Sequence, residues 1–355
     1  MKFYLILLLV LLFFVIINFD KLDSINQIEQ FNNFDIDMYD EIKSNISLEE
    51  YNKKFNTKIV ELPYNVAAFG IDMDTKEKIF IHLNDVSYIY LNETLDYWMN
   101  NIHEKLNKRK YHLLLCYSDG YKFDEVNNLK YIITFATKNV NHNIFTFAKR
   151  WNDNDSICIP DPFYTSRKKH IVEMKTIDES PIDWSSKKNV CIWRGKVKNG
   201  HTSNFFEQDG KDDLNPRKYF VKMHREGKFN NVDYQDEYTS ITQQLNYKYI
   251  LDMDGWSSTW DATIWKLYSG SVLFKVKSTW QQWYYDELIE WEHYVPISND
   301  FSDLNEKIEW CILNDDKCKQ IAKNAKAFVI EKLNLEYVNN KIVERTLKYF
   351  KNTEQ

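Results

Sequence analysis

The sequence lacks the excess of basic residues that nonspecific nucleic-acid binding requires. Its 355 residues include 46 Lys and Arg against 52 Asp and Glu, a formal net charge of −6. Proteins bind a phosphate backbone through basic surface, so this balance argues against a nucleic-acid-binding protein. Internal repeats and long low-complexity segments are also missing, and the length is sufficient for two domains with sizeable cores.

Cysteine is scarce, and its spacing gives no indication of a zinc site. The five cysteines form neither a CxxC pair nor a Cys/His pattern: Cys116, Cys158, Cys191, Cys311 and Cys318. The last two flank a predicted break between helices. On one continuous helix they would lie about 10 Å apart, too far for a disulfide. Across a helix-turn-helix an oxidising lumen would permit a bond, and buried free thiols are the alternative.

The N-terminus carries an apolar run from Phe3 to Ile17. The run is short for a bilayer span and suits a signal-peptide core, but no small-x-small cleavage site follows it. We therefore predict an uncleaved signal anchor at 1–20, with a cleaved signal peptide as the alternative. Either one places the chain in the secretory pathway, as a single-pass type II protein of the ER or Golgi membrane or as a secreted protein. Three N-x-S/T triplets are compatible with this glycoprotein route: Asn45, Asn92 and Asn154.

Strands and helices alternate along two halves of the chain. This alternation predicts an α/β fold with two Rossmann-like domains that face a central cleft. In the first half, strands are expected at Lys78–Leu83, Tyr111–Tyr117 and Lys130–Ala136, with a helix near Leu91–Lys108. In the second half, a strand is expected at Asn189–Trp193 and helices from about Ser302, Asp315 and Leu335. The predicted divisions are an anchor (1–20), a stem (21–57), a first domain (58–185), a second domain (186–334) and a C-terminal helix (335–355).

The stretch from Asn246 to Ile297 has the pattern of a βαβ crossover. Its expected elements are a strand at Tyr249–Met253, a helix at Thr259–Tyr268 and a strand at Ser271–Val276. Ser257 or Ser258 can cap the helix, and Gly270 stands where a helix C-terminal glycine belongs. Ligands of open α/β sheets bind at the carboxyl ends of the strands. The free N–H groups at the helix start there favour an anion such as a diphosphate.

Several segments of the second half resemble glycosyltransferase family 90. This family holds the Rumi-type protein O-glucosyltransferases, their KDEL-motif-containing relatives and the capsule-associated xylosyltransferases. The matching segments are VCIWRG (190–195), KYILDMDG (248–255), SGSVLF (269–274) and STWQQWYYDELIEWEHYVPI (278–297). The resemblance implies a GT-B arrangement in which the first domain receives the acceptor, the second binds the nucleotide sugar, and the last helix crosses back to the first domain. It also implies an inverting transfer of glucose or xylose from a UDP-sugar to a hydroxyl of a protein or glycan.

Asp119 is the candidate catalytic base. It follows an apolar strand and precedes a glycine, so its carboxylate is expected at a strand's carboxyl end. The family's catalytic aspartate has a similar position in its first half. The alternative is an ordinary Asp-Gly turn. By resemblance, the loop Ile159–Pro162 is expected to contact the acceptor or the sugar.

A second set of residues is expected to bind the nucleotide. Arg194 ends a strand, and its guanidinium suits phosphate oxygens; a structural salt bridge is the alternative. The turn after the next strand offers backbone N–H groups and hydroxyls. The complete candidate set is Arg194, Gly195, Asp254, Gly255, Trp256, Ser257, Ser258 and Lys266. Lys266 is included because many relatives have an arginine early in the helix, where this chain has Asp261, and a lysine one turn later could substitute for it.

Two D-x-D triplets invite a metal interpretation. They are Asp72-Met73-Asp74 and Asp252-Met253-Asp254, and D-x-D holds Mn²⁺ in glycosyltransferases of the GT-A class. Family 90 enzymes are metal-independent, so we expect no metal and no cofactor besides the donor substrate. His293 is interpreted as a structural residue.

Two other functions remain open from the sequence. The acidic Asp261 motivates a catalytically inactive lumenal protein that binds a nucleotide or carbohydrate with the same fold. A glycoside hydrolase with paired carboxylates is a weaker alternative, because that chemistry needs no nucleotide site. The expected partners are a UDP-sugar, a protein or glycan acceptor and, through the N-terminus, a membrane.

Overall fold

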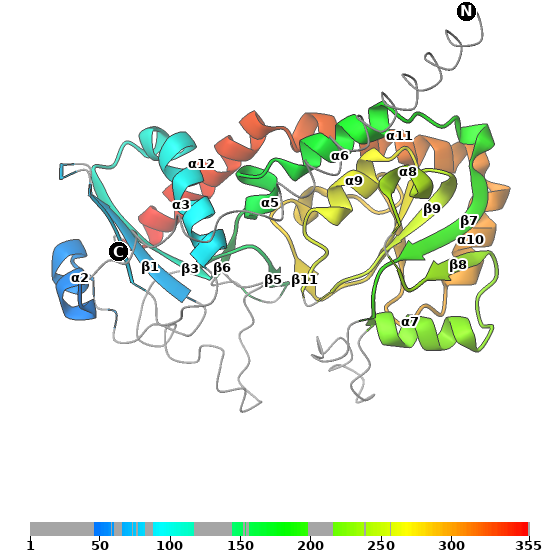
Figure 1. The fold of residues 1–355 in the computed structure, drawn as a ribbon, viewed down its shortest axis with the longest axis horizontal. Helices are drawn as coiled ribbons and strands as arrows, with labels where there is room; N and C mark the ends of the chain where they lie inside the picture. The colour runs from blue at the N-terminus through cyan, green and yellow to red at the C-terminus, as the bar shows by residue number, and fades with distance from the viewer. Residues whose placement is uncertain are drawn as a thin grey trace, which may run out of the picture. The chain divides into compact units, whose positions relative to one another are not determined.

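The computed structural model describes much of the chain from residue 46 onward (Figure 1). The described residues are 46–57, 59, 66–72, 74–75, 77–81, 88–116, 144–151, 153, 156–197, 216–237, 239–255 and 257–353. They belong to one unit, residues 45–355. The predicted anchor (1–20), the candidate base Asp119, Trp256 and the predicted strand Lys130–Ala136 lie outside the described residues.

The first half contains a five-stranded sheet in the order β2-β1-β3-β4-β6. Its strands are β1 (Val66–Asp72), β2 (Glu77–Ile81), β3 (Lys110–Cys116), β4 (Ile144–Thr146) and β6 (Ser156–Cys158). β1 runs antiparallel to β2 and to β3, whereas β3, β4 and β6 are parallel. The sheet is therefore mixed, unlike the parallel sheet that a Rossmann-like domain implies. Because β1 and β2 are joined by a short connection, they can pair only as an antiparallel hairpin.

The sequence patterns do not predict β1, because its sequence VAAFGID is rich in small residues. Alanine and glycine have low strand propensity, yet the whole strand is buried. A Cβ at Gly70 would lie 2.1 Å from the ring of Phe55, so only glycine leaves room for that ring. Phe55 belongs to α2 (Leu48–Phe55), whose start is fixed by a capping box between Ser47 and Glu50. Tertiary packing therefore determines this strand.

Other elements of the first half agree with the sequence patterns. β2 and β3 confirm the strands predicted at Lys78–Leu83 and Tyr111–Tyr117. Helix α3 (Tyr88–Asn101) and the 3-10 turn η2 (His103–Leu106) together confirm the helix expected near Leu91–Lys108. The connection to the second half is made by α5 (Pro162–Thr165), α6 (Lys169–Asp178) and the 3-10 turn η3 (Trp184–Ser186).

The second half is built on a parallel five-stranded sheet in the order β12-β10-β9-β7-β8. Its strands are β7 (Lys188–Arg194), β8 (Val232–Gln235), β9 (Tyr247–Asp252), β10 (Val272–Val276) and β12 (Val295–Ile297). β9 and β10 are buried along almost their whole length, as strands covered on both faces are. This sheet confirms the α/β fold predicted for the second half.

Helices connect the parallel strands. α7 (Pro216–Arg225), α8 (Ile241–Gln244) and α9 (Ala262–Tyr268) lead into β8, β9 and β10. After β12 come α10 (Leu304–Leu313) and α11 (Asp315–Lys332), and α11 packs against α9 and β10. Gly270 has a φ of +66° directly after the C-cap Ser269, which confirms the predicted glycine at the end of this helix.

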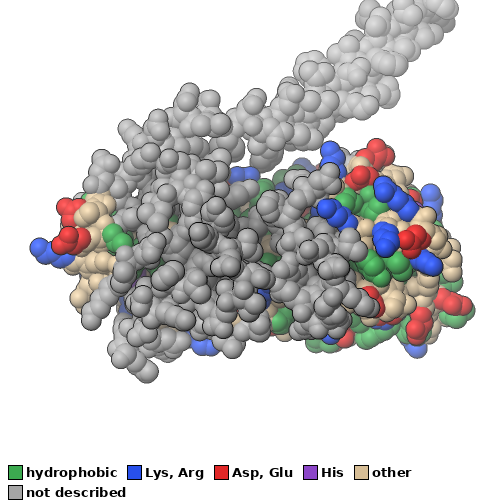
Figure 2. Space-filling model, turned by 90° about the horizontal axis from the view of Figure 1, so that it is seen from below, with side chains coloured by type: hydrophobic (Ala, Val, Ile, Leu, Met, Phe, Trp, Pro, Cys, Tyr) green, Lys and Arg blue, Asp and Glu red, His purple; other side chains and the backbone are tan. Residues whose placement is uncertain are grey.

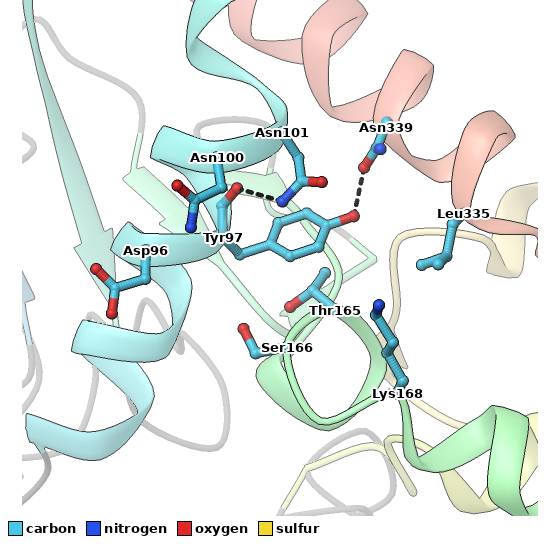
Figure 3. A pocket seen from close by; sticks show the side chains of 9 residues that line it. All are labelled: Asp96, Tyr97, Asn100, Asn101, Thr165, Ser166, Lys168, Leu335 and Asn339. Carbon is cyan, nitrogen blue, oxygen red and sulfur yellow. Dashed lines mark hydrogen bonds between the residues drawn. The ribbon is translucent and has the colours of Figure 1, made fainter.

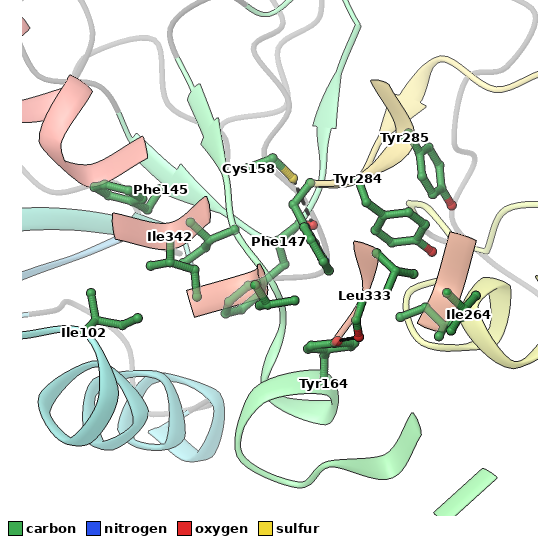
Figure 4. Close-up of a cluster of buried hydrophobic side chains, with 14 of the residues drawn as sticks. Ile102, Phe145, Phe147, Cys158, Tyr164, Ile264, Tyr284, Tyr285, Leu333 and Ile342 are labelled. Carbon is green, nitrogen blue, oxygen red and sulfur yellow. Dashed lines mark hydrogen bonds between the residues drawn. The ribbon is translucent and has the colours of Figure 1, made fainter. Parts of the chain in front are cut away.

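The last helix, α12 (Leu335–Thr353), crosses back to the first half, as the family resemblance implies. The ring of Tyr349 lies 5.1 Å from that of Phe145 in β4, and Arg345 donates to the carbonyls of Cys158 and Trp283. A short antiparallel pair, β5 (Lys149–Arg150) with β11 (Trp280–Gln281), also joins the halves. One hydrophobic cluster therefore includes residues of both halves (Figure 4).

All five cysteines are buried and none is bonded to another in this structure, and pairing of Cys311 with Cys318 stays a prediction. The neighbouring thiol of Cys318, across the turn between α10 and α11, raises the pKa of Cys311 together with burial.

Basic and acidic side chains are interspersed on the described part of the face drawn in Figure 2, in keeping with the nearly balanced composition. Within the described residues, none of the helices combines the length and the apolar character that crossing a bilayer requires.

Candidate active site

The strand order of the second sheet creates a switch point at β7. From β7 the chain continues to β8 on one side and then returns to β9 on the other. In parallel α/β sheets, ligands bind in the crevice outside the carboxyl ends of the strands that flank such a point. Here β7 ends at Arg194 and β9 ends at Asp252. The predicted residues Arg194, Gly195, Asp254 and Gly255 therefore lie at one edge of the sheet.

Arg217, at the start of α7, joins the two strand ends. Its Nε donates to the carbonyl of Asp254 at 2.9 Å, and its Nη1 donates to the carbonyl of Lys196 at 3.5 Å. The guanidinium lies 5.6 Å from the ring of Trp193, and a Cβ on Gly255 would come within 3.2 Å of it. The sequence patterns do not predict a role for this residue. A proline directly before it, which favours a helix start, is the one local signal.

Arg194 contacts β8. Its Nη1 donates to the carbonyl of Asp233 at 2.8 Å, and its Nη2 donates to the carboxylate of Asp233 at 2.7 Å. The guanidinium also lies 5.7 Å from the ring of Tyr247. The Arg194 side chain is 3% exposed, and its Nε has no hydrogen-bond partner within the described part of the chain. The salt bridge that was the alternative to a phosphate role is present, and contact with a diphosphate stays a prediction.

The turn after β9 is held by its own side chains. The hydroxyl oxygen of Ser257 accepts a hydrogen bond from the indole of Trp260 at 3.3 Å, and that of Ser258 accepts one from the side-chain amide of Gln282 at 3.0 Å. Neither serine caps the helix, so that prediction is wrong. α9 begins only at Ala262, because Trp260 has a φ of +46° and a left-handed residue cannot continue a right-handed helix.

The start of α9 carries the acidic residue that departs from the family pattern. Asp261 is the N-cap residue and makes no side-chain capping bond. Its carboxylate instead forms an ion pair with Lys169 of α6. The negative charge at this helix start is therefore balanced by a lysine from the first half.

Asp252 is the centre of a buried ion cluster beneath the turn. Its carboxylate lies 2.6 Å from Lys266 Nζ and 3.7 Å from Lys275 Nζ, and it accepts hydrogen bonds from the hydroxyls of Thr259 and Thr263. Burial opposes ionisation, but the two lysines outweigh it and lower the pKa of Asp252 to about 2. Lys266 is thus paired with a buried carboxylate, a partner that the predicted diphosphate contact did not anticipate.

Asp254 belongs to the same cluster. It is buried, accepts a hydrogen bond from the hydroxyl of Ser278, and has its pKa raised to about 6 by burial. The two carboxylates, at 252 and 254, face three cations, Arg217, Lys266 and Lys275. Lys266 also faces Glu173 of α6, so the cations of this cluster are shared among several carboxylates. Cations gathered at the strand ends suit an anionic ligand there.

Residues of the first half contact the turn and the start of α9. The ring of Trp260 lies 5.6 Å from Phe147 and 5.8 Å from Phe163. Asp161, in the loop that the resemblance links to the acceptor or sugar, caps α5 and is 3% exposed. Burial, together with the charge of Asp261, raises the pKa of Asp161 to about 7.

Glu173 of α6 is a third carboxyl group in this region, beside those of Asp161 and Asp261. It lies 3.0 Å from Lys169, which also pairs with Asp261. Burial raises the pKa of Glu173 to about 7 although the lysine opposes the shift. Carboxyl groups with such pKa values exchange protons near neutral pH, so this region can hold or release protons there.

The remaining sequence candidates have structural partners. Within the described residues, no group of three or more His, Cys, Asp or Glu side chains is arranged to hold a metal ion. Asp72 lies 3.3 Å from Lys110, and Asp74 pairs with Arg109. The Nδ1 atom of His293 accepts the backbone N–H of Ile289 at 3.0 Å, which confirms its structural interpretation.

The strands of a parallel sheet end at a switch point beside the cationic side chains of Arg217, Lys266 and Lys275, an arrangement that suits an anionic ligand. Residues 133–351 match the sequence profile of glycosyl transferase family 90. The match covers more than half of the 355 residues, and the chain belongs to this family.

Individual relatives align over shorter segments. Uncharacterized protein 179R of Invertebrate iridescent virus 6 is 36% identical over 118 residues, which are 30% of this chain and 10% of that protein. Protein O-glucosyltransferase 1 of Rattus norvegicus is 32% identical over 96 residues, 27% of this chain and 24% of that protein. The matched segments thus span a quarter or less of these relatives' own lengths. A crystal structure of a glycosyltransferase from Rickettsia africae ESF-5 aligns over 79% of this chain and 87% of its own, with 13% identity and a TM-score of 0.39.

Proposed function

We propose that this chain is an inverting glycosyltransferase that moves glucose or xylose from a UDP-sugar to a hydroxyl of a protein or glycan acceptor. Membership of glycosyl transferase family 90 supports the reaction class, and a relative named as a protein O-glucosyltransferase supports glucose as the sugar. The observation that carries the proposal is the set of cations, Arg217, Lys266 and Lys275, gathered at the end of β9 around Asp252 and Asp254. Charge of this sign stabilises the diphosphate that departs during transfer.

In this proposal Asp119 removes the proton from the acceptor hydroxyl, which then attacks the anomeric carbon in line. Arg194, Gly195 and the turn of residues 254–258 hold the departing diphosphate. Lys266 acts on the diphosphate through the field of the buried cluster, because its ammonium is paired with Asp252. Groups fixed in this way need no rearrangement when charge develops on the leaving group.

We also propose the arrangement around this reaction. The two halves take the GT-B form, with the acceptor on the side of the first half. The apolar run at 1–20 directs the protein to the secretory pathway as a type II signal anchor. The transfer is independent of metal, since Arg217, Lys266 and Lys275 supply the positive charge that a divalent cation gives other transferases.

UDP release from the full chain tests the proposal. The protein is incubated with UDP-glucose, UDP-xylose, UDP-galactose and UDP-N-acetylglucosamine, with and without EDTA. We expect UDP to be released from UDP-glucose or UDP-xylose at a rate that EDTA does not change. Release that EDTA abolishes and Mn²⁺ restores would overturn metal independence.

The second candidate function is an inactive nucleotide-binding protein of the same fold. The ion pair between Asp261 and Lys169 favours it, because the helix start presents a neutralised acid where relatives have an arginine. UDP binding without release of UDP from any donor in the panel would support this candidate. If the protein neither binds UDP nor releases it from a donor, the glycoside hydrolase is the remaining alternative. Hydrolysis of aryl glycosides tests that function.

A further inference from the structure

A pocket of about 300 Å³ lies between α3, the turn that joins α5 to α6, and the start of α12 (Figure 3). None of the candidate active-site residues lines it. Of the elements that line the pocket, α3 leads through η2 into the beginning of β3. The predicted base follows the other end of β3. The volume of the pocket is at the lower end of the range for small-molecule sites.

Three carboxamide groups, Asn100, Asn101 and Asn339, contribute to the polar lining of the pocket. Tyr97 donates its hydroxyl hydrogen to Oδ1 of Asn339, and Asn101 donates from Nδ2 to the carbonyl of Tyr97 at 3.0 Å. These bonds leave the amide hydrogens of Asn339 and the amide oxygen of Asn101 without a partner among the described residues. The same holds for the whole carboxamide of Asn100. The pocket therefore offers both donors and acceptors.

The charges of the lining cancel. Lys168 contributes one positive charge and Asp96 one negative charge, so neither a phosphate nor a polycation is favoured. The ring of Tyr97 and the side chain of Leu335 add apolar surface. A neutral pyranose combines hydroxyl groups, which pair with amides, and C–H faces, which pack on rings.

The wall that carries Lys168 is held firmly. Ser166 donates its hydroxyl hydrogen to the carbonyl of Glu93 at 2.9 Å, and Arg167 donates to the carboxylate of Glu93 at 3.0 Å. Lys168 has a φ of +50°, a conformation that lysine rarely adopts and glycine adopts freely. Glycine would adopt this conformation without the strain that the lysine side chain adds. Such strain is common at binding sites.

We propose that this pocket binds a neutral saccharide unit, separate from the donor sugar. It is an accessory carbohydrate site that recognises one or two sugar rings through Asn100, Asn101 and Asn339. The proposal does not depend on catalysis, because a protein without transferase activity could bind a sugar here equally well.

Saturation-transfer NMR on the full chain tests the proposal. The probes are maltose and xylobiose, with glucuronic acid as a charged comparison, each titrated with and without saturating UDP. We expect saturable binding of a neutral disaccharide that UDP does not displace. No saturable binding of either disaccharide, displacement by UDP, or stronger binding of glucuronic acid would overturn the proposal.

Substitutions of residues that line the pocket test whether the sugar binds there. Asn100 is exposed, so Asn100→Trp fills the pocket from its rim and should abolish binding, and Asn100→Ala should weaken it about tenfold. Asn340→Trp is the matched control, because Asn340 is the exposed neighbour of Asn339 on α12. Lys168→Gly removes the ammonium and relieves the backbone strain, so it should weaken binding without lowering the melting temperature. Equal binding by wild type, Asn100→Trp and Lys168→Gly would place the sugar elsewhere and refute this site.

Discussion

Lys266 and Asp252 form an ion pair of 2.6 Å in the interior, directly beneath the turn that follows β9. The pair connects the end of a central strand to the helix that follows it. The carboxylate of Asp252 also lies 3.7 Å from the ammonium of a second lysine, Lys275. The positive charge offered to a ligand at this edge of the sheet therefore depends on buried side chains and persists in salt better than a surface patch does.

We expect Lys266→Met to destabilise the protein by about 3–5 kcal/mol, because it leaves a buried carboxylate with one distant counterion. Urea denaturation of the purified protein measures this loss. The double variant Lys266→Met/Asp252→Asn should recover much of the stability, since the buried carboxylate is removed and Asp254 still faces Lys275. Lys323→Met, at an exposed position of α11, is the control and should change little. A loss below about 1 kcal/mol in Lys266→Met would contradict the assignment of this pair.

Arg217→Met should weaken UDP binding by about tenfold, because two carbonyls that fix the strand ends lose their donor. Isothermal titration with UDP measures the change. Lys222→Met, an exposed substitution on the same helix, is the control and should leave the affinity unchanged. Equal affinities of the Arg217→Met and wild-type proteins would show that the turn after β9 does not depend on this guanidinium.

The buried carboxyl of Asp161 makes stability depend on pH. Its pKa is raised from 3.8 to about 7, so the folded state binds the proton more tightly than the unfolded state does. The resulting stabilisation is present below about pH 4 and is lost as the pH rises through about 7. Asparagine also caps helices, so Asp161→Asn keeps the local structure and removes the titration.

Unfolding free energies at pH 4, 5.5 and 7 check this expectation. The stability of the wild type relative to Asp161→Asn should fall by up to about 4 kcal/mol between pH 4 and pH 7, the equivalent of a shift of about three units. Asp300→Asn alters an exposed carboxylate that bonds Ser302, and it serves as the control. A difference that rises with pH, or that does not change, would refute the raised pKa.

Asp119→Asn should lower kcat by about a hundred- to ten-thousand-fold and leave UDP affinity intact, since a positioned base contributes that much to proton transfer. Steady-state UDP release and UDP titration of the same preparation separate the two effects. Asp96→Asn, a substitution in the separate pocket, is a control for general damage to the first half. An unchanged kcat in Asp119→Asn removes this residue from the mechanism.

The sequence predicted those elements whose signal is local. β3, β9 and β10 are rich in apolar residues, and Gly270 follows an amphipathic stretch, where a glycine indicates a helix end. β1 escaped prediction because its alanine and glycine residues weaken the strand signal, and Gly70 is needed there to leave room for the ring of Phe55. The start of α9 was misplaced because the left-handed Trp260 packs against Phe147 and Phe163, which are distant in the sequence.

In the candidate site, too, local features could be predicted from the sequence and long-range contacts could not. Strand ends follow from the sequence, so Arg194 and the turn at Gly255 could be placed at one edge of the sheet. The partners of their charged neighbours could not be predicted, because Asp233 lies 39 residues from Arg194 and comes from an adjacent strand. Arg217 could not be predicted either, since its contacts are backbone carbonyls that leave no trace in the sequence.

The position of bound UDP is the most direct test of the account. A crystal structure of the full chain with UDP should show the diphosphate at the carboxyl ends of β7 and β9, within hydrogen-bonding distance of the turn at residues 254–258. UDP bound at any other edge of either sheet, with that turn and Arg194 unoccupied, would contradict it.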